Sequence, residues 1–195
     1  MPPYAPADPA VAPSRPVEEV GSVTETYISA DMAAAVGREL GRRVSFPISA
    51  SDIRKWAVAV YWPEEPPRLY WDEAYAATTS HAGIVAPEEF NPFAWMTAEP
   101  AGPRRATGEG EGMHFIERSL GIEPPPLRFV LNGGLSVEYG VRMRPGDVIT
   151  AVSKLAGYRE REGRLGRMLF AVTEESWTNQ QGAPVKRAEM TLIRY

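Results

Sequence analysis

The side chains that could do acid–base chemistry gather between residues 65 and 81. Glu65 lies among prolines, Tyr70 follows five residues later, and His81 lies eleven residues beyond Tyr70. A tyrosine phenol has an unperturbed pKa of about 10 and is a poor general base near neutral pH. The sequence places no carboxylate where it would orient His81, so we expect that residue on the surface or in a supporting position. Tyr70 is therefore predicted to line a pocket rather than to move a proton.

Composition excludes several other kinds of chemistry. The 195 residues contain no cysteine and two histidines, His81 and His114, which are well separated in the chain. Thiol catalysis and iron–sulfur ligation are therefore excluded, and a zinc site would need carboxylates at most of its positions. We expect neither a metal nor another cofactor.

Charge and hydropathy argue against two classes of partner. The net charge is −4 and the isoelectric point is about 5.4, whereas a nucleic-acid-binding surface needs clustered basic residues. No apolar run approaches the roughly 20 residues that cross a bilayer, and the proline-rich start lacks the apolar core of a signal peptide. We expect a cytoplasmic protein that binds neither nucleic acid nor membrane.

The chain is predicted to form one domain preceded by a tail. Residues 1–25 begin with a proline-rich stretch that has few large apolar side chains, so we expect a mobile tail. Residues 26–195 suffice for a single core. Within them, residues 97–126 are rich in Gly, Pro and Glu and are predicted to form a long loop, in which only MHFIERSLG forms a brief helix.

Apolar periodicity predicts the elements of the N-terminal half. It favours a short helix over residues 26–40, capped by Ser29 or Asp31. Residues 42–49 alternate like a strand that contains a proline, which indicates an edge strand. A clearer helix is predicted over residues 51–62, where a proline then stops it.

The remaining patterns predict a helix and then a sheet. Residues 74–78 suit one helical turn, and residues 83–96 are predicted to be a helix that two prolines interrupt. From residue 127 onwards, long alternating segments are joined by the turn sequences RPGD and NQQG. Such segments with tight connections predict an antiparallel meander.

Two groups of motifs carry a family resemblance over residues 51–195. Asp72, Tyr75, Ala76 and Gly83 stand in register with a D-x-x-Y-A segment and with a Gly that opens a central helix. The runs NGG-x-x-x-EY, RPGD, TNQ-x-G and TLIRY follow in the same order as in the family. The chain thus resembles the FAS1-like dehydratase, or MaoC N-terminal-type, branch of the MaoC-like hot-dog family. The resemblance implies an α+β hot-dog fold, an antiparallel sheet wrapped around a central helix that is shortened here.

The resemblance also implies a function. Active relatives hydrate 2-enoyl thioesters with an Asp and a His, but Tyr70 occupies the His position and Glu65 the approximate Asp position. The chain is therefore similar to the noncatalytic, substrate-shaping subunit of a heteromeric (R)-specific 2-enoyl-CoA hydratase. A catalytic MaoC-like subunit would supply the dyad in a hetero-oligomer. The substrate would be an acyl-CoA or acyl-carrier-protein thioester, with a bulky or steroid side-chain acyl group as one possibility.

The predicted substrate contacts surround the degenerate dyad. They are Tyr70, Trp71, Gly83, Ile84, Phe90 and Phe93. The backbone N–H groups of Gly83 and Ile84 would hold the thioester carbonyl at a helix start. Two simpler interpretations stay open: Gly83 permits a turn, and the aromatic residues pack on one another.

Other functions also stay open. One is a self-sufficient homodimeric hydratase or dehydratase that uses Glu65, Tyr70 or His81. Another is a subunit of a 3-hydroxyacyl-ACP dehydratase. A third is a noncatalytic module for thioester binding or assembly.

Overall fold

The computed structural model describes residues 26–94 and 112–195, except residue 165. The predicted tail, residues 1–25, and residues 97–111 of the predicted loop lie outside this part. In chain order the elements are α1 (Ala30–Ala34), β1 (Glu39–Val44), α2 (Ala50–Tyr61), η1 (Arg68–Tyr70), α3 (Glu73–Ala77), η2 (Gly112–His114), α4 (Phe115–Leu120), β2 (Val130–Tyr139), β3 (Thr150–Gly163), β4 (Gly166–Thr178) and β5 (Pro184–Arg194).

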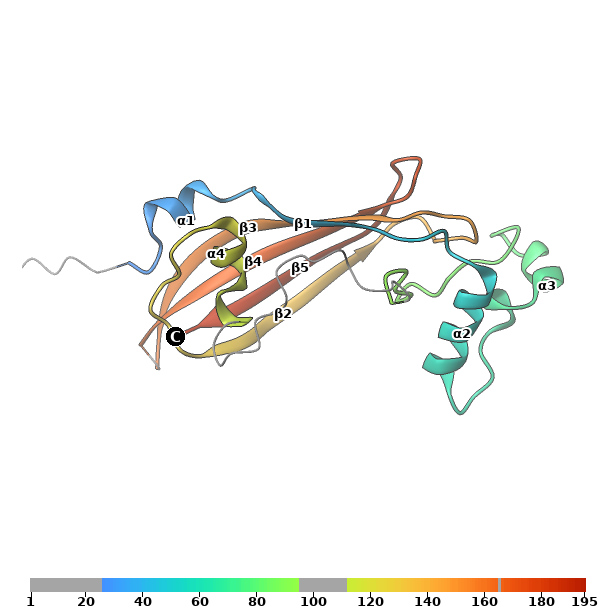
Figure 1. Ribbon diagram of the computed structural model, residues 1–195. Helices are drawn as coiled ribbons and strands as arrows, with labels where there is room; N and C mark the ends of the chain where they lie inside the picture. The colour runs from blue at the N-terminus through green and yellow to red at the C-terminus, as the bar shows by residue number, and fades with distance from the viewer. Residues whose placement is uncertain (1–25, 95–111, 165) are drawn as a thin grey trace, which may run out of the picture.

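The strands form one antiparallel sheet in the order β1-β3-β4-β5-β2 (Figure 1). Strands β3, β4 and β5 follow one another in the chain and lie side by side, which confirms the predicted meander. Strand β1 lies at one edge and β2 at the other. The predicted edge strand is also confirmed, although it occupies Glu39–Val44 rather than residues 42–49.

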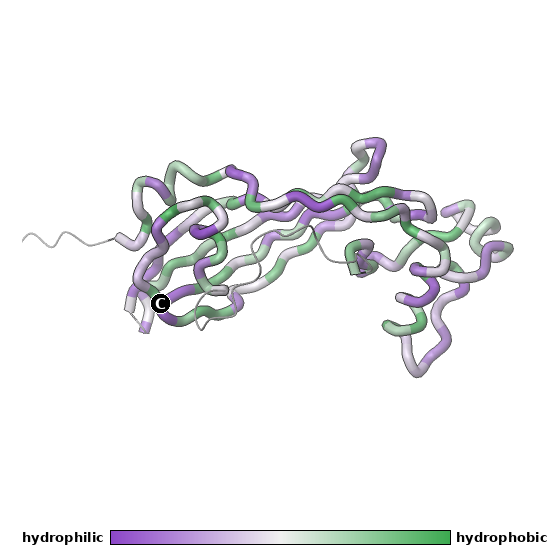
Figure 2. Tube along the Cα trace, viewed as in Figure 1, coloured by the Kyte–Doolittle hydropathy of each residue, from purple (hydrophilic) through white to green (hydrophobic). Residues whose placement is uncertain are grey.

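Alternation along β4 shows that one face of the sheet is covered. Leu169, Ala171, Thr173 and Trp177 are buried, whereas the residues between them are partly exposed. Successive side chains of a strand point to opposite faces, so the buried set defines the inner face. Hydrophobic and hydrophilic residues alternate along the strands in Figure 2.

The first helix is shorter than the sequence predicts. Helix α1 is capped by Ser29, whose side chain accepts a hydrogen bond from the Met32 N–H at 3.2 Å. The helix stops before Gly37, which has a φ of +89° that glycine adopts readily. The prediction that residues 35–40 continue the helix is wrong, because Glu39–Val44 pairs with β3 instead.

Helix α2 has the predicted position and a different cap. The sequence predicts that Ser51 and Asp52 open this helix, but the Ser49 side chain is the cap and accepts a hydrogen bond from the Asp52 N–H at 3.0 Å. Ile53 and Ala57 are fully buried on its inner face. Helix α3 overlaps the helical turn predicted over residues 74–78 but begins one residue earlier, and α4 lies within the predicted MHFIERSLG segment.

The helix predicted over residues 83–96 does not form over its described part, residues 83–94. Pro87 and Pro92 have no amide hydrogen to donate. The Ala86 N–H donates to the Met143 carbonyl at 2.8 Å, so tertiary pairing holds this segment instead of a helical bond. Helices α2 and α3 lie beyond one end of the sheet, and no helix of the described part crosses its middle (Figure 1).

The buried residues form two separate clusters. The first, near α2 and α3, contains Ile48, Ile53, Ala76, Ile84, Ala86, Phe90, Phe93, Met143, Ile149, Ala151, Trp177 and Val185. The second, under α1 and α4, contains Met32, Ala35, Ile116, Leu120, Ile122, Leu127, Leu155, Leu169 and Ala171. The sheet therefore joins two packed ends of the molecule.

Candidate functional site

A pocket of about 210 Å³ lies between the first turns of α2 and the segment from η1 to α3. Its walls are Ala50, Ser51, Arg54, Tyr70, Trp71, Glu73 and Ile84. It thus brings together three of the predicted substrate-contact residues, Tyr70, Trp71 and Ile84. Whether they touch substrate stays a prediction.

Asp72 fixes the turn that carries two of these walls. Its carboxylate accepts a hydrogen bond from the Tyr75 N–H at 2.9 Å and another from Arg68 at 2.6 Å. Both hydrogen bonds hold the pKa of Asp72 below its usual value, and the bond from the Tyr75 N–H has the larger effect. Asp72 therefore caps α3, which gives the D-x-x-Y-A motif a structural role here.

The aromatic walls are also held in place. The Trp71 Nε1–H donates to the Pro66 carbonyl at 3.0 Å. The rings of Tyr70 and Tyr61 lie 6.1 Å apart, and the interaction with the Tyr70 hydroxyl is the main cause that raises the pKa of Tyr61. Trp71 consequently presents ring carbons to the pocket, since its one polar atom already has a partner.

The pair of amides predicted at a helix start is not formed. The Gly83 N–H donates to the Ala76 carbonyl at 3.0 Å, and Gly83 is not among the pocket walls. Its φ of +150° suits glycine, in agreement with the interpretation that Gly83 permits a turn. The Ile84 N–H donates no hydrogen bond within the described residues. One of the two expected donors therefore remains.

Phe90 and Phe93 belong to the core rather than to the pocket walls. They are 1% and 8% exposed. Phe90 packs edge-on against Trp56 at 5.7 Å, and Phe93 against Trp177 at 5.2 Å. Neither ring is a wall of this pocket, because each has an aromatic partner inside the first buried cluster, and their contact with substrate stays a prediction.

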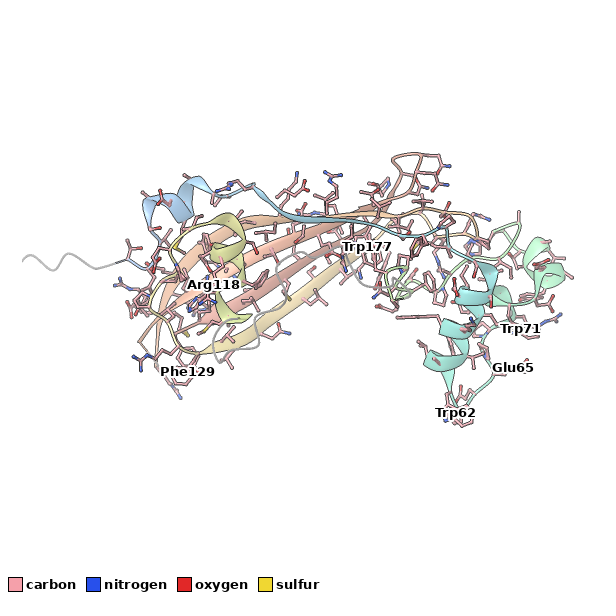
Figure 3. The ribbon with its side chains drawn as sticks, in the orientation of Figure 1. Trp62, Glu65, Trp71, Arg118, Phe129 and Trp177 are labelled. Atoms are coloured by element: carbon pink, nitrogen blue, oxygen red, sulfur yellow. The ribbon has the colours of Figure 1, made fainter. Side chains whose placement is uncertain are left out.

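The other predicted acid–base residues lie away from the pocket walls. Glu65 is exposed on the loop after α2 (Figure 3), and His81 is partly buried. The His81 carbonyl accepts a hydrogen bond from Arg144 at 2.7 Å, and its ring makes no hydrogen bond within the described residues. The walls from the described part of the chain therefore include no Asp/His pair, and their one carboxylate is Glu73.

Ser51, Arg54 and Glu73 are pocket residues that the sequence analysis missed. Ser51 and Arg54 are three residues apart in a predicted helix, which places them on one face. No local signal says that this face meets η1, because the contact joins segments that a proline-rich loop separates.

A second polar cluster lies under α4. The Arg194 guanidinium binds both carboxylate oxygens of Glu117, at 2.7 and 2.8 Å, and both side chains are fully buried. Tyr158 donates to the same carboxylate at 2.7 Å. His114 approaches Arg194 through Nδ1 at 3.4 Å and the Leu127 carbonyl through Nε2 at 3.2 Å.

Burial and charge set the protonation of this cluster. Burial alone would raise the pKa of Glu117, but the hydrogen bonds from Arg194 and Tyr158 hold it below its usual value. Burial, and then the nearby Arg194 cation, lower the pKa of His114. A neutral His114 fits this geometry, because Nε2–H can donate to Leu127 while Nδ1 accepts from Arg194.

Within residues 26–94 and 112–195, no three His, Cys, Asp or Glu side chains lie together as a metal-binding group. None of the helices in that part is long and apolar enough to cross a membrane.

Comparison with solved structures defines the class of fold. The ChsH1–ChsH2 complex from Mycobacterium tuberculosis matches with a TM-score of 0.58 and 20% identity, over 85% of this chain and 88% of that chain. R-hydratase PhaJ1 from Pseudomonas aeruginosa matches with a TM-score of 0.47 and 16% identity, over 82% and 81%. The C-terminally truncated HadBC dehydratase complex from M. tuberculosis gives 0.48 and 17%, over 81% and 99%. The chain thus has a hot-dog-like α+β fold, as the resemblance implied.

Comparison of sequences defines the family. Residues 34–188 match the model of the FAS1-like, dehydratase domain region. The chain belongs to this family of MaoC-like hot-dog proteins. No curated protein sequence matches it significantly.

Proposed function

We propose that this chain is the noncatalytic, substrate-binding subunit of a heteromeric (R)-specific 2-enoyl-thioester hydratase. Its family and its pocket support this proposal. The observation that carries it is the composition of the pocket, which Tyr70 lines and whose described walls include no Asp/His pair. The resemblance places Tyr70 at the family's His position.

The reaction explains why that pair matters. Hydration of an enoyl thioester needs one group that activates water at the β-carbon and one that delivers a proton at the α-carbon. It also needs donors for the developing enolate oxygen. This chain offers binding surface from the walls of its pocket. A catalytic MaoC-like partner would supply the acid–base pair.

Edge strand β2 is the surface that we propose for the partner. Leu135 is 64% exposed, Leu131 is 50% exposed, and Phe129, just before the strand, is 60% exposed. An edge strand also presents unpaired backbone groups to another chain. The similar ChsH1–ChsH2 and HadBC structures are complexes, which agrees with a hetero-oligomer.

The test is reconstitution with a MaoC-like subunit encoded beside this chain. Hydration of a 2-enoyl-CoA is measured for each protein alone and for the mixture. We expect little turnover from this chain alone and a large gain in the mixture. If the partner alone is as active as the mixture on every chain length, this chain does not shape the substrate.

The acyl group is a further part of the proposal. A bulky or steroid side-chain acyl group would reach beyond the pocket, because Phe90 and Phe93 fill the neighbouring core. The kcat/KM of the reconstituted pair is compared for a short linear enoyl-CoA and a steroid-bearing one. A preference for the short substrate would exclude the bulky acyl group and leave the hydratase assignment in place.

A further inference from the structure

The pocket beside Tyr70 offers hydrogen-bond donors that the protein does not use. The Arg54 guanidinium, the Ser51 hydroxyl and the Ile84 N–H belong to its walls. None of the three donates a hydrogen bond to another described residue. Ile84 is only 7% exposed, so its amide has little access to bulk water. A buried donor without a partner carries a free-energy cost that a ligand acceptor removes.

Arg54 differs from the arginines around it. Arg68 binds the Asp72 carboxylate at 2.6 Å, and Arg144 binds the His81 carbonyl at 2.7 Å. These two arginines therefore hold the protein's own turns. Arg54 has no such partner in the described part of the chain, although it lines the pocket.

The remaining walls limit what the donors can bind. Trp71 supplies a flat ring whose Nε1–H is already used, and Glu73 is a carboxylate on the same pocket. One cation and one anion give these charged walls no net charge. A ligand with several acceptor oxygens in a small volume therefore fits better than an apolar acyl chain.

Resting on the function proposed above, we infer that this pocket binds the phosphate of the phosphopantetheine arm, and that Arg54 selects it. This arm is common to CoA and acyl-carrier-protein thioesters. A guanidinium presents a planar fork of donors that matches a phosphate group, and such charge-assisted bonds are among the strongest in proteins. Ser51 adds a donor from the same face of α2 as Arg54, and the Ile84 amide adds one from a different segment. The acyl group then lies outside this pocket, toward the partner.

Binding of 4′-phosphopantetheine and of pantetheine to the full chain, measured by calorimetry, tests the inference. The wild-type protein should bind the phosphorylated compound more tightly. Arg54→Gln should weaken that binding about tenfold, as expected for loss of hydrogen bonds to a charged group, and leave pantetheine unchanged. Arg54→Lys keeps the charge and should lose less. Equal binding of the two compounds to the wild-type protein would overturn the inference.

Two further variants give matched controls. Lys55 is the adjacent residue, is also exposed and is not a pocket wall, so Lys55→Gln should leave the binding of 4′-phosphopantetheine unchanged. Glu73→Gln removes a like charge from the pocket and should tighten that binding. An equal loss in Lys55→Gln and Arg54→Gln would mean a general charge effect and would contradict the assignment of Arg54.

CoA and a phosphopantetheinylated acyl carrier protein separate the two sources of the arm. The natural carrier should bind Arg54→Gln more weakly than the wild-type protein. If neither carrier loses affinity for this variant, the inference is refuted.

A hydration assay of the reconstituted pair with enoyl-CoA and with enoyl-pantetheine separates this inference from the proposed function. If the pair hydrates both compounds and Arg54→Gln does not change kcat/KM for either, the inferred phosphate site is contradicted and the proposed function stands. Weaker phosphopantetheine binding in Arg54→Gln without any hydration would keep the phosphate site and remove the function.

Discussion

At the residue scale, the positions of this chain that match the family's motifs have structural roles. Asp72 caps α3, Gly83 makes a turn, and Tyr70 forms a pocket wall. A fully buried ion pair lies elsewhere, between Glu117 and Arg194 under α4. Removing one member of such a pair leaves an uncompensated charge in the core, whereas exposed pairs contribute little.

Glu117→Gln should therefore lower the free energy of unfolding by about 3–5 kcal/mol. The control is Glu174→Gln, which breaks a surface pair with Arg187 and should cost at most about 1 kcal/mol. Urea denaturation at neutral pH measures both. Similar losses in the two variants would show that burial of the Glu117 pair does not set its strength.

His114 should make stability depend on pH. Its pKa is lowered in the folded state, so the folded protein binds fewer protons than the unfolded chain as pH falls below about 6.5. The resulting stability is complete above that pH and is lost on acidification, with Glu117 adding a further loss below its own unfolded value of about 4.5. Unfolding free energies at pH 7.5 and 5.5 should differ more in the wild type than in His114→Gln. His81→Gln is the control, and an equal flattening in both variants would contradict this role of His114.

At the element scale, backbone contacts with distant segments replaced the helix that the local pattern predicted in two places. Apolar periodicity predicted α2, α3 and the meander correctly, because each has its own caps, turns or alternation. Residues 35–40 were predicted as helix, but edge pairing with β3 begins at Glu39. Residues 83–94 were also predicted as helix, but backbone pairing with Met143 holds them extended or turned. Neither of these two backbone contacts can be predicted from the residues of the segment itself, because each joins it to a distant part of the chain.

Gly140 follows the last residue of β2 and lies close to the backbone of β5, so a side chain does not fit there. A Cβ on Gly140 would lie 2.1 Å from the Pro184 carbonyl oxygen, so the β2–β5 pairing would have to shift. Gly140→Ala should destabilise the fold by about 1–3 kcal/mol, as overpacking typically does. Gly157→Ala is the control, since no atom of the described residues lies within 4 Å of its Cβ position. Thermal unfolding compares them, and equal midpoints would contradict the close approach.

At the scale of the whole molecule, two packed ends leave an apolar edge strand open. The pocket belongs to one end and the buried charge cluster to the other. The sequence predicted the hot-dog-like fold and the region of the pocket, because motif order and strand alternation are linear features. It could not predict Arg54 or Glu73 as walls, since those contacts depend on how α2 folds against η1.

The open edge predicts an oligomer. Leu135→Lys should lower the mass seen by light scattering at micromolar concentration, or prevent assembly with a coexpressed MaoC-like subunit, with little change in thermal stability. Val141→Lys, at a 46% exposed residue beyond the strand, is the control. A wild-type protein that stays monomeric both alone and with that subunit would contradict the interface.

The proposed noncatalytic role depends on the lack of a complete acid–base pair among the described walls of the pocket, and a steady-state hydration assay of the isolated chain tests that role most directly. Several 2-enoyl-CoA chain lengths are assayed with the wild type, Tyr70→Phe, Glu73→Gln and His81→Ala. We expect little turnover from any of them, with the same residual rate in all four. Turnover like that of a hydratase with an Asp/His pair, abolished by one of these substitutions, would show that the chain is itself the catalyst.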